Sequence, residues 1–404
     1  MLNLPGFKVL DWEVKDNQRL YTVEPINRPT SCPTCGGTLH VHRRLTRHVQ
    51  DLPAFDNRVG LEVQHRTYRC ADCGDTFSPE YDQIDGRFTK RFKEQLKKET
   101  LNFSFRELAA RYGISDVEVG RLFREKKAEI EENYVLETPR VLGIDEVHFQ
   151  KHYFGVLVKV NKEDGQIIEM TETRTVEMMT AVLQAMQHKE NLRCVTMDMY
   201  KPYVTSVRSV FPDVPIVIDR FHVIKELLRC IEKKRRALSH TIKQQKVRAS
   251  LKNNRFLILG SGDQLTPTQK ERLDQLFQDY PQFQPVYELK EAFRSIYEFA
   301  KTRKEAEEMY AEWLEESKDI TELDEFKKTV HRWHDLIFNY FSVNEESKTN
   351  AQTESLNNII KRVVSQGRGY SFPAIRCKML FRKTEKMPQK FDWGVFEDDE
   401  DDEE

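Results

Sequence analysis

The chain has 404 residues, of which 39% are hydrophobic and 32% are charged, and its formal net charge at pH 7 is −2. It contains no apolar run that could span a bilayer, and its N-terminus lacks the basic and then apolar pattern of a secretion signal. These features argue against a membrane-spanning or secreted protein. We expect a cytoplasmic globular protein of several domains with no membrane partner.

The net charge conceals an uneven distribution along the chain. The last eight residues, EDDEDDEE, are all acidic, so that without these eight negative charges the rest of the chain carries a net +6. A run of like charges of this length is usually disordered and solvated. We interpret residues 391–404 as an acidic disordered tail, and an autoinhibitory segment that competes with DNA is the alternative.

Four of the seven cysteines form two CxxC pairs, in CPTCGG and CADCGD. Two such tight turns can aim four thiolates at one tetrahedral zinc ion, whereas redox-active pairs are the alternative. Strands at 39–52 and 58–70, joined by a loop at 53–57, would bring the two turns together. The pattern predicts a zinc ribbon within residues 1–82. Its predicted zinc ligands are Cys32, Cys35, Cys70 and Cys73, and its predicted DNA-binding residues are Arg43, Arg44 and Arg47.

Residues 83–136 follow the helix-turn-helix pattern, with a basic helix in front of it. Ser104 and Ser115 can each cap a helix, and Gly113 between the two helices suits a sharp turn. The second helix of this motif enters the major groove of DNA, whereas a plain helical hairpin is the alternative. The candidate DNA contacts are Ser115, Asp116, Glu118, Arg121, Arg124 and Lys126.

An alternation of strands and helices begins at residue 137 and continues to residue 221. The expected strands are 140–149, 153–161, 166–174, 193–200 and 214–223, and the expected helices are 175–187 and 201–211. Three antiparallel strands, then helix, strand, helix and strand, match the order of a ribonuclease-H-like core. The whole chain therefore reads as a multidomain α+β protein.

Three acidic residues occupy the positions that such a core would bring together. Asp145 lies in the first strand, Asp198 ends the fourth strand, and Glu354 lies in the first turns of a later helix. Carboxylates gathered at one end of a sheet repel one another unless cations lie between them. We expect these three to be catalytic residues that hold two Mg²⁺ or Mn²⁺ ions.

Other acidic residues compete for the same role. Glu146 is a weaker ligand candidate, because adjacent residues of a strand point to opposite faces. Asp219 also ends a strand and forms Asp-x-x-His with His222. We interpret this pair as neighbours of the site, and Asp219 as the second metal ligand is the alternative. Each acid could also be an ordinary strand-end or helix residue.

Amphipathic helices fill residues 222–345, and residues 346–390 return to the core with the predicted catalytic Glu. Trp313 and Trp333 of the helical part are expected to be core anchors, with base stacking as the alternative. The domains predicted in chain order are 1–82, 83–136, 137–221, 222–345, 346–390 and 391–404.

These residues resemble the ISL3 family of DDE insertion-sequence transposases. The motifs that carry the resemblance are CPTC and CADC, GIDEVHF, VTMDMYKPY, IVIDRFHVIK and TESLNNIIKRVVSQGRGYSF. The resemblance covers nearly the whole chain except the acidic tail. It implies a zinc ribbon, a helix-turn-helix, a ribonuclease-H-like catalytic core with a helical insertion, and the catalytic residues Asp145, Asp198 and Glu354.

The resemblance also implies the reaction and the partners. The enzyme would bind the terminal inverted repeats as double-stranded DNA, hydrolyse a phosphodiester at the element end, and join the freed 3′-hydroxyl to target DNA without ATP. A homodimer or larger assembly on DNA and a nucleoid-associated location follow from this reaction. Residues beside the predicted site that could hold phosphates are Lys361, Arg362 and Arg368.

Two rival functions remain open at the level of sequence. A DNA-binding regulator with an inactive ribonuclease-H-like domain would share the zinc ribbon and the helix-turn-helix, but it needs none of the three acids. A ribonuclease-H-like nuclease or resolvase would cleave DNA without strand transfer. Substitution of the three acids separates the regulator from an enzyme, and the formation of joined products separates the nuclease from a transposase.

Overall fold

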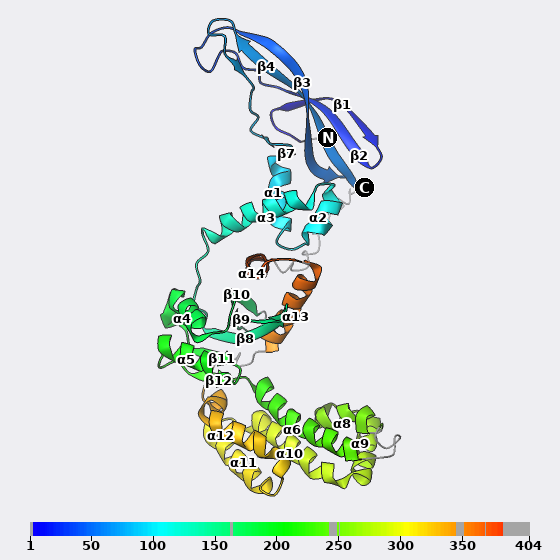
Figure 1. Ribbon diagram of the computed structural model, residues 1–404, viewed down its shortest axis with the longest axis vertical. Helices are drawn as coiled ribbons and strands as arrows, with labels where there is room; N and C mark the ends of the chain where they lie inside the picture. Colours follow the sequence, from blue (N-terminus) through cyan, green and yellow to red (C-terminus); the bar gives the residue numbers. More distant parts are fainter. Residues whose placement is uncertain are drawn as a thin grey trace, which may run out of the picture. The chain divides into compact units, whose positions relative to one another are not determined.

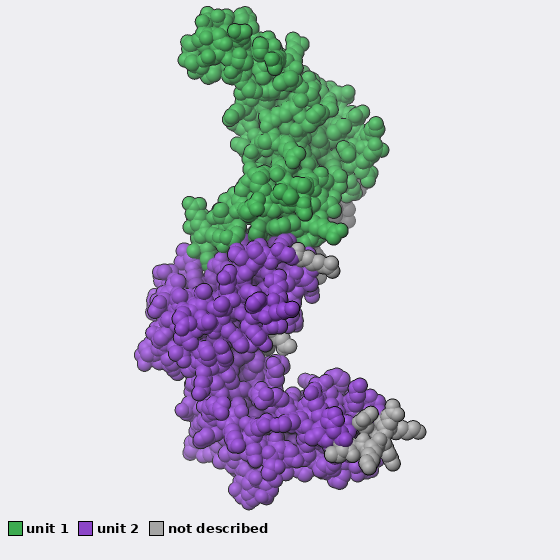
Figure 2. Space-filling view, viewed as in Figure 1, with its two compact units in different colours: residues 1–134, 381–404 green, residues 135–380 purple. Residues whose placement is uncertain are grey.

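The computed structural model describes residues 3–161, 165–241, 249, 251–344, 351–367 and 369–382, without the side chains of 241 and 351–354. The chain divides into two compact units, the first of residues 1–134 with 381–404 and the second of residues 135–380 (Figure 2). The expected turn at 162–164 and the acidic tail at 391–404 lie outside the described residues.

The first unit contains a seven-stranded sheet (Figure 1). Its strands are β1 (Phe7–Lys15), β2 (Gln18–Pro25), β3 (Leu39–Ala54), β4 (Asn57–Cys70), β5 (Thr76–Phe77), β6 (Ile84–Asp85) and β7 (Phe88–Thr89). The order across the sheet is β1-β2-β4-β3-β7-β6, and β5 pairs with β4. The predicted hairpin of β3 and β4 is present, but its loop is only Phe55 and Asp56, both at positive φ.

The hairpin of β1 and β2 is a part of the sheet that the sequence interpretation lacked. Asp16 and Asn17 form its two-residue turn at positive φ, which is the geometry that joins two twisted strands most directly. β2 runs parallel to β4, and Tyr21 and Val23 of β2 pack with Leu61 and Val63 of β4 in a small core. The N-terminal region is therefore a folded sheet to which the cysteine turns are attached.

Three helices follow the sheet in the first unit: α1 (Lys90–Glu99), α2 (Phe105–Tyr112) and α3 (Asp116–Glu131). Ser104 and Ser115 accept hydrogen bonds from backbone N–H groups in the first turns of α2 and α3, as predicted. Gly113 is left-handed with φ of 67° and ends α2. The Gln50 amide donates to the carbonyl of Tyr112 at 2.6 Å, which fixes the helical turn on the sheet.

The second unit is built on a five-stranded sheet of order β10-β9-β8-β11-β12. Its strands are β8 (Val141–Phe149), β9 (His152–Lys159), β10 (Gln166–Thr171), β11 (Cys194–Met197) and β12 (Ile216–Ile218). The first three are antiparallel, and β11 runs parallel to both β8 and β12. The helices α4 (Val176–Ala185) and α5 (Lys201–Val210) pack against each other beside the sheet. This is the predicted ribonuclease-H-like order.

One predicted element has the wrong length. The fifth strand was expected at 214–223, but β12 covers only Ile216–Ile218, and Arg220 already begins helix α6. The carbonyl of Asp219 accepts hydrogen bonds from the backbone N–H groups of His222 and Val223. Phe221 and Val223 therefore extend the apolar run of β12 into the first turn of α6, which is why the predicted strand is too long. His222 lies on this helix.

The remaining helices follow β12. They are α6 (Arg220–Thr241), α8 (Arg255–Leu259), α9 (Pro267–Asp279), α10 (Gln284–Phe299), α11 (Arg303–Glu316), α12 (Asp324–Phe338), α13 (Ala351–Gln366) and α14 (Phe372–Phe381). One hydrophobic core continues from the sheet into these helices. Trp313 and Trp333 are buried in it, as expected, and the indole of Trp313 donates to the carbonyl of Leu289.

Helix α12 packs on β12, and the next long helix, α13, packs on β8. The chain therefore returns to the sheet after the helical segment. Within the described residues, no helix combines the length and the apolar character that crossing a membrane would require.

Candidate active site and metal centres

Three aspartates lie at the same level of three neighbouring parallel strands, Asp145 within β8, Asp198 directly after β11 and Asp219 directly after β12. In the register of the sheet, Met197 of β11 pairs with Ile144 of β8 and with Ile218 of β12. Asp145, Asp198 and Asp219 each follow directly after this row. The structure thus brings Asp145 and Asp198 together, and Asp219 belongs to the same row.

The carboxyl group of Asp145 is buried beside another negative charge. Burial and, next, the negative charge of Asp198 raise the pKa of Asp145 to about 7. Its Oδ1 accepts a hydrogen bond from the backbone N–H of Glu146, and its Oδ2 accepts one from the side chain of Asn357. A carboxyl group that is both buried and close to another negative charge is the arrangement that a cation would relieve.

His222 lies between the other two aspartates. Its Nδ1 is 2.8 Å from Asp198 Oδ1 and 3.2 Å from Asp219 Oδ2. Burial lowers the pKa of His222, but the hydrogen bonds to Asp198 and Asp219 outweigh burial and raise the pKa to about 10. The imidazolium thus offsets the two carboxylates. Ligand atoms of Asp145, Asp198 and His222 all lie within 4.8 Å of one another.

Helix α13 supplies a residue that the sequence interpretation missed. Asn357 Nδ2 lies 2.8 Å from Asp145 Oδ2 and 3.3 Å from the carbonyl oxygen of Glu146. Its Oδ1 is buried and has no hydrogen-bond partner among the described residues. The predicted catalytic Glu354 is in the same helix, but its side chain lies outside the described residues.

A cavity of about 630 Å³ lies over the aspartates. Its lining includes Asp145, Asp198 and Asp219 together with cationic side chains from α6, α10 and α13. These cations are Arg220, Lys225, Arg294 and Lys361. Of the predicted phosphate-binding residues, Lys361 lines the cavity, Arg362 is exposed on the same helix, and Arg368 lies outside the described residues.

Glu146 also lines this cavity, but its carboxylate has a cationic partner. Arg174, from the loop between β10 and α4, forms an ion pair with Glu146. The guanidinium of Arg174 also lies over the rings of Tyr153 and Tyr200, at 4.2 and 4.6 Å from their centroids. Glu146 is therefore engaged at the edge of the cavity and is not part of the Asp145, Asp198 and His222 cluster.

The four cysteines of the two CxxC pairs come together at the open end of the β3–β4 hairpin, opposite its two-residue loop. Cys32 Sγ is 3.7 Å from Cys73 Sγ, and Cys35 Sγ is 3.5 Å from Cys70 Sγ. These separations are far longer than a disulfide bond, and they approach the ~3.8 Å edge of a tetrahedron of sulfurs about 2.3 Å from zinc. The pKa of the Cys32 thiol is lowered to about 7, mainly by a hydrogen bond from the backbone N–H of Cys35. The donor set fits a structural zinc ion.

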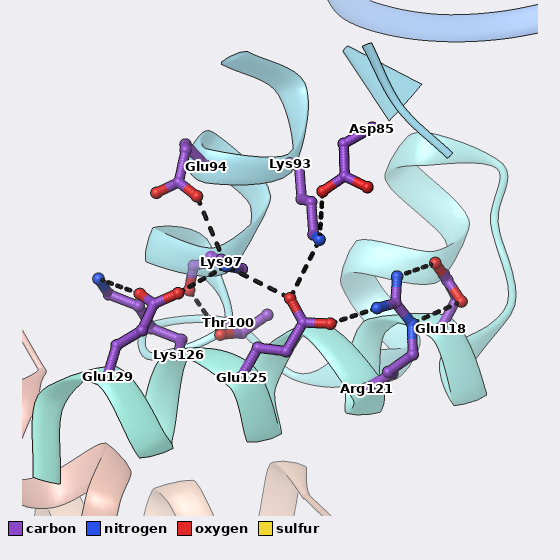
Figure 3. A network of polar contacts seen from close by, with 10 residues as sticks. All are labelled: Asp85, Lys93, Glu94, Lys97, Thr100, Glu118, Arg121, Glu125, Lys126 and Glu129. Atoms are coloured by element: carbon purple, nitrogen blue, oxygen red, sulfur yellow. Dashed lines mark hydrogen bonds and ion pairs between the residues drawn. The ribbon is translucent and has the colours of Figure 1, made fainter. Parts of the chain in front are cut away.

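The predicted DNA-binding arginines of the first unit differ in their surroundings. Arg43 and Arg44 are exposed on β3, whereas Arg47 donates to the carbonyl of Gly86. On α3, Arg121 is paired with Glu118 and Glu125, as Figure 3 shows. Lys126 is paired with Glu129 at 3.1 Å, while Arg124 is exposed.

A network of ion pairs joins α1 to α3. Lys97 is buried, and its ammonium group lies 2.6 Å from Glu129 and 3.3 Å from Glu125 (Figure 3). Lys93 pairs with Glu125 at 3.2 Å and with Asp85 at 2.7 Å. These contacts use several of the acidic groups of α3 to hold the helix in place.

The order of these parts along the chain defines the class of protein, since a ribonuclease-H-like core that is interrupted by helices and preceded by a zinc ribbon is the organisation of a DDE transposase. The chain belongs to the ISL3 family of transposases, whose family model matches residues 142–379. Residues 28–73 match the zinc finger of the transposases of IS204, IS1001, IS1096 and IS1165. The resemblance to this family is thereby confirmed.

A relative supports the same assignment over almost the full length. The chain is 23% identical over 381 residues to the transposase for insertion sequence element IS1001 of Bordetella parapertussis. The matched region covers 90% of this chain and 91% of that protein. The similarity therefore includes the zinc ribbon, the helical region and the ribonuclease-H-like core together.

Proposed function

We propose that this transposase binds the terminal inverted repeats of its insertion sequence and catalyses cation-dependent DNA cleavage and strand transfer. The observation that carries the proposal is the row of Asp145, Asp198 and Asp219 in a cavity that four cationic side chains also line. A row of carboxylates attracts divalent cations, and nearby cationic side chains attract the phosphates of DNA. A regulator that only binds DNA would not need the acidic row.

Asp145 and Asp198 are the residues that would hold the divalent cations. Carboxylate oxygens are the preferred ligands of Mg²⁺ and also suit Mn²⁺. The raised pKa of Asp145 and the buried Oδ1 of Asn357 both fit a site that receives a cation. When bound, two such ions would stabilise the charge that develops on the phosphate.

Glu354 is the third acid of the proposal, on the basis of helical periodicity. Residues three, four and seven positions apart share a face of a helix. Asn357, Asn358 and Lys361 of α13 all line the cavity, and Glu354 precedes them by three, four and seven residues. The position of Glu354 thus belongs to the face of α13 that borders the site.

The chain's own residues would position DNA for two successive displacements. Lys225, Arg294 and Lys361 would bind phosphates on either side of the cleaved bond. Hydrolysis at the element end would free a 3′-hydroxyl, which would then attack a target phosphodiester. One phosphodiester bond forms as another breaks, and the leaving 3′-oxygen takes a proton, so no ATP is needed. Because two ends must be joined, we propose at least a homodimer on DNA.

The proposal is tested with D145N, D198N and E354Q in a cleavage and joining assay. The substrate is a duplex that carries the terminal repeat of the element that encodes the chain, with supercoiled plasmid as the target and Mg²⁺ as the cation. We expect the wild type to nick the end and to give joined products, and the three variants to bind the duplex but to lose both steps by at least a thousandfold.

The matched control is E177Q, since Glu177 is an exposed acid in the first turn of α4. It should cleave like the wild type. Binding without any cleavage by the wild type would favour the DNA-binding regulator. Cleavage without joined products would favour a nuclease or resolvase.

A further inference from the structure

The outer part of the β3–β4 hairpin is a two-stranded ribbon that differs from the rest of the sheet. We call residues 39–47 of β3 and 63–70 of β4 the distal ribbon; it leads to the cysteine turns (Figure 1). A strand with one covered face buries every second side chain. By contrast, all seven residues from His40 to Thr46 are exposed, including Val41 at 44% and Leu45 at 50%. This part of β3 is therefore covered on neither face.

The charge of the distal ribbon is entirely of one sign. It contains five arginines and no aspartate or glutamate. Arg44 lies directly opposite Arg66 in the antiparallel register. Like charges in directly opposite positions destabilise a pair of strands. Arg66 has Glu24 at 4.0 Å, the outer limit of an ion pair, and no ion pair of Arg44 occurs within the described residues. An anion between the two arginines would remove this repulsion.

The adjacent row of the ribbon carries groups that can distinguish bases. Thr46 pairs with Gln64 two positions along from Arg44 and Arg66, so the four side chains share one face. Arginine recognises guanine, glutamine recognises adenine, and threonine contacts several bases at their major-groove edges. The major groove is wide enough to admit a two-stranded ribbon.

Helix α3, which would be the reading helix of a helix-turn-helix, presents the opposite charge balance. It has four basic and five acidic residues, hence a net charge of −1. Arg121 and Lys126 are occupied by acidic neighbours, as Figure 3 shows. Val117, near its N-terminus, is 75% exposed. This helix has little to attract it to a phosphate-lined groove.

We propose that the distal ribbon, rather than α3, enters the major groove of double-stranded DNA, with Arg44, Thr46 and Gln64 contacting base edges. The inference rests on the proposed function, since it names the element that reads the terminal repeat. Positive charge also protects an exposed edge strand from pairing with another chain. That role, however, does not call for two opposed arginines beside a threonine and a glutamine on one face.

The test compares full-length wild type, R44A, Q64A and R124A for affinity to two duplexes. One duplex carries the terminal 40 base pairs of the element, and the other has the same composition in scrambled order. We expect R44A and Q64A to lower the ratio of the two affinities about tenfold or more, which is the usual effect of losing a bidentate base contact. R124A, the exposed control on α3, should weaken both affinities alike and keep the ratio within twofold.

A second measurement leaves the protein unchanged. Guanines of the element duplex are replaced one at a time by 7-deazaguanine, which lacks the N7 acceptor of the major groove. Replacement of the guanine that Arg44 contacts should weaken binding by the wild type and by R124A. The same replacement should have no effect on binding by R44A. Zinc content and melting temperature confirm that each variant is folded.

The proposal is overturned if R44A and Q64A both keep the wild-type affinity ratio, or if R124A lowers the ratio while they do not. Its failure is distinct from failure of the proposed function. A wild type that selects the element duplex through the ribbon but never cleaves it would contradict only the catalytic activity.

Discussion

Asn357 Nδ2 donates a hydrogen bond to Asp145 Oδ2 at 2.8 Å, across 212 positions of sequence. This contact ties helix α13 to the first strand of the core. The same amide reaches the carbonyl of Glu146. Asn357 is thus placed to set both the orientation of Asp145 and the position of α13.

N357A is expected to slow cleavage at least tenfold, because Asp145 loses a donor and α13 loses its attachment to β8. The stability loss should be modest, about 1 kcal/mol, as for a typical hydrogen bond. Single-turnover cleavage measured over a range of Mg²⁺ concentrations checks the prediction, since a misplaced ligand also raises the Mg²⁺ concentration required. S355A, at an exposed position of the same helix, is the control. Equal rates and equal Mg²⁺ requirements in N357A and S355A would contradict the positioning role.

D145N should stabilise the protein in EDTA while abolishing its response to Mg²⁺. The raised pKa of Asp145 means that the folded protein binds more protons than the unfolded chain between pH ~4 and ~7, so the carboxyl group makes folding less favourable as the pH rises through this window. Removal of the charge at pH 8 should therefore raise the unfolding free energy by about 1–3 kcal/mol, and much less at pH 4.5. The Asn357 amide can rotate so that its unpartnered Oδ1 accepts from the new side chain.

Melting temperatures at pH 8 and pH 4.5, with EDTA or with Mg²⁺, provide the measurement. Mg²⁺ should raise the melting temperature of the wild type and of E177Q, because a ligand that binds only the folded state stabilises it. It should leave D145N unchanged. A Mg²⁺ response of wild-type size in D145N would show that the cations bind elsewhere.

The sequence was sufficient for the parts of the site that depend on local order. Asp145 and Asp198 each follow a short apolar run, and the parallel register of β8 and β11 places the ends of these two runs together, so the proximity of the two residues could be predicted. Asn357 could not, because one amide among several polar residues of a helix gains its role only where the helix crosses β8. His222 was found, but its element was not, because the apolar pattern of the short strand β12 continues through Phe221 and Val223 into α6.

Charge pairing on α3 was readable from the sequence but was overlooked. Glu118 and Glu125 lie three residues before and four residues after Arg121, the spacings at which helical side chains meet. A count of basic residues does not reveal that Arg121 and Lys126 have acidic partners on the same helix. The exposure of the distal ribbon, in contrast, depends on which strands fail to cover it, and a sequence pattern does not contain that information.

C35S should remove zinc while leaving most of the first unit folded. The four thiols lie at the end of the hairpin, whereas Tyr21, Val23 and Leu61 form a separate core in the sheet. We expect about one zinc per chain in the wild type by elemental analysis and none in C35S. Hydrogen exchange should rise in the two cysteine turns only. Stoichiometric zinc in C35S would rule out a four-cysteine site, and exchange throughout the sheet would show that zinc organises the whole unit.

Lys290 makes the free energy of unfolding depend on pH, and this effect does not involve the candidate active site. It is fully buried in α10, where its ammonium group donates to the carbonyls of Ile258 and Gly260 and pairs with Glu291 at 2.6 Å. Burial lowers its pKa to about 8, despite the contribution of Glu291 in the other direction. Between pH 8 and 10.5 the unfolded chain then binds more protons than the folded one, so this residue makes unfolding less favourable as the pH rises.

K290M lacks this titration, so the stability of the wild type relative to K290M should increase by up to about 3 kcal/mol from pH 7.5 to pH 10. Urea unfolding followed by tryptophan fluorescence is a suitable measurement, because the indole of Trp313 donates to the carbonyl of Leu289, the residue before Lys290. K304M is the control, since Lys304 is highly exposed on α11. A pH response of K290M equal to that of the wild type and K304M would mean that Lys290 remains charged throughout this range.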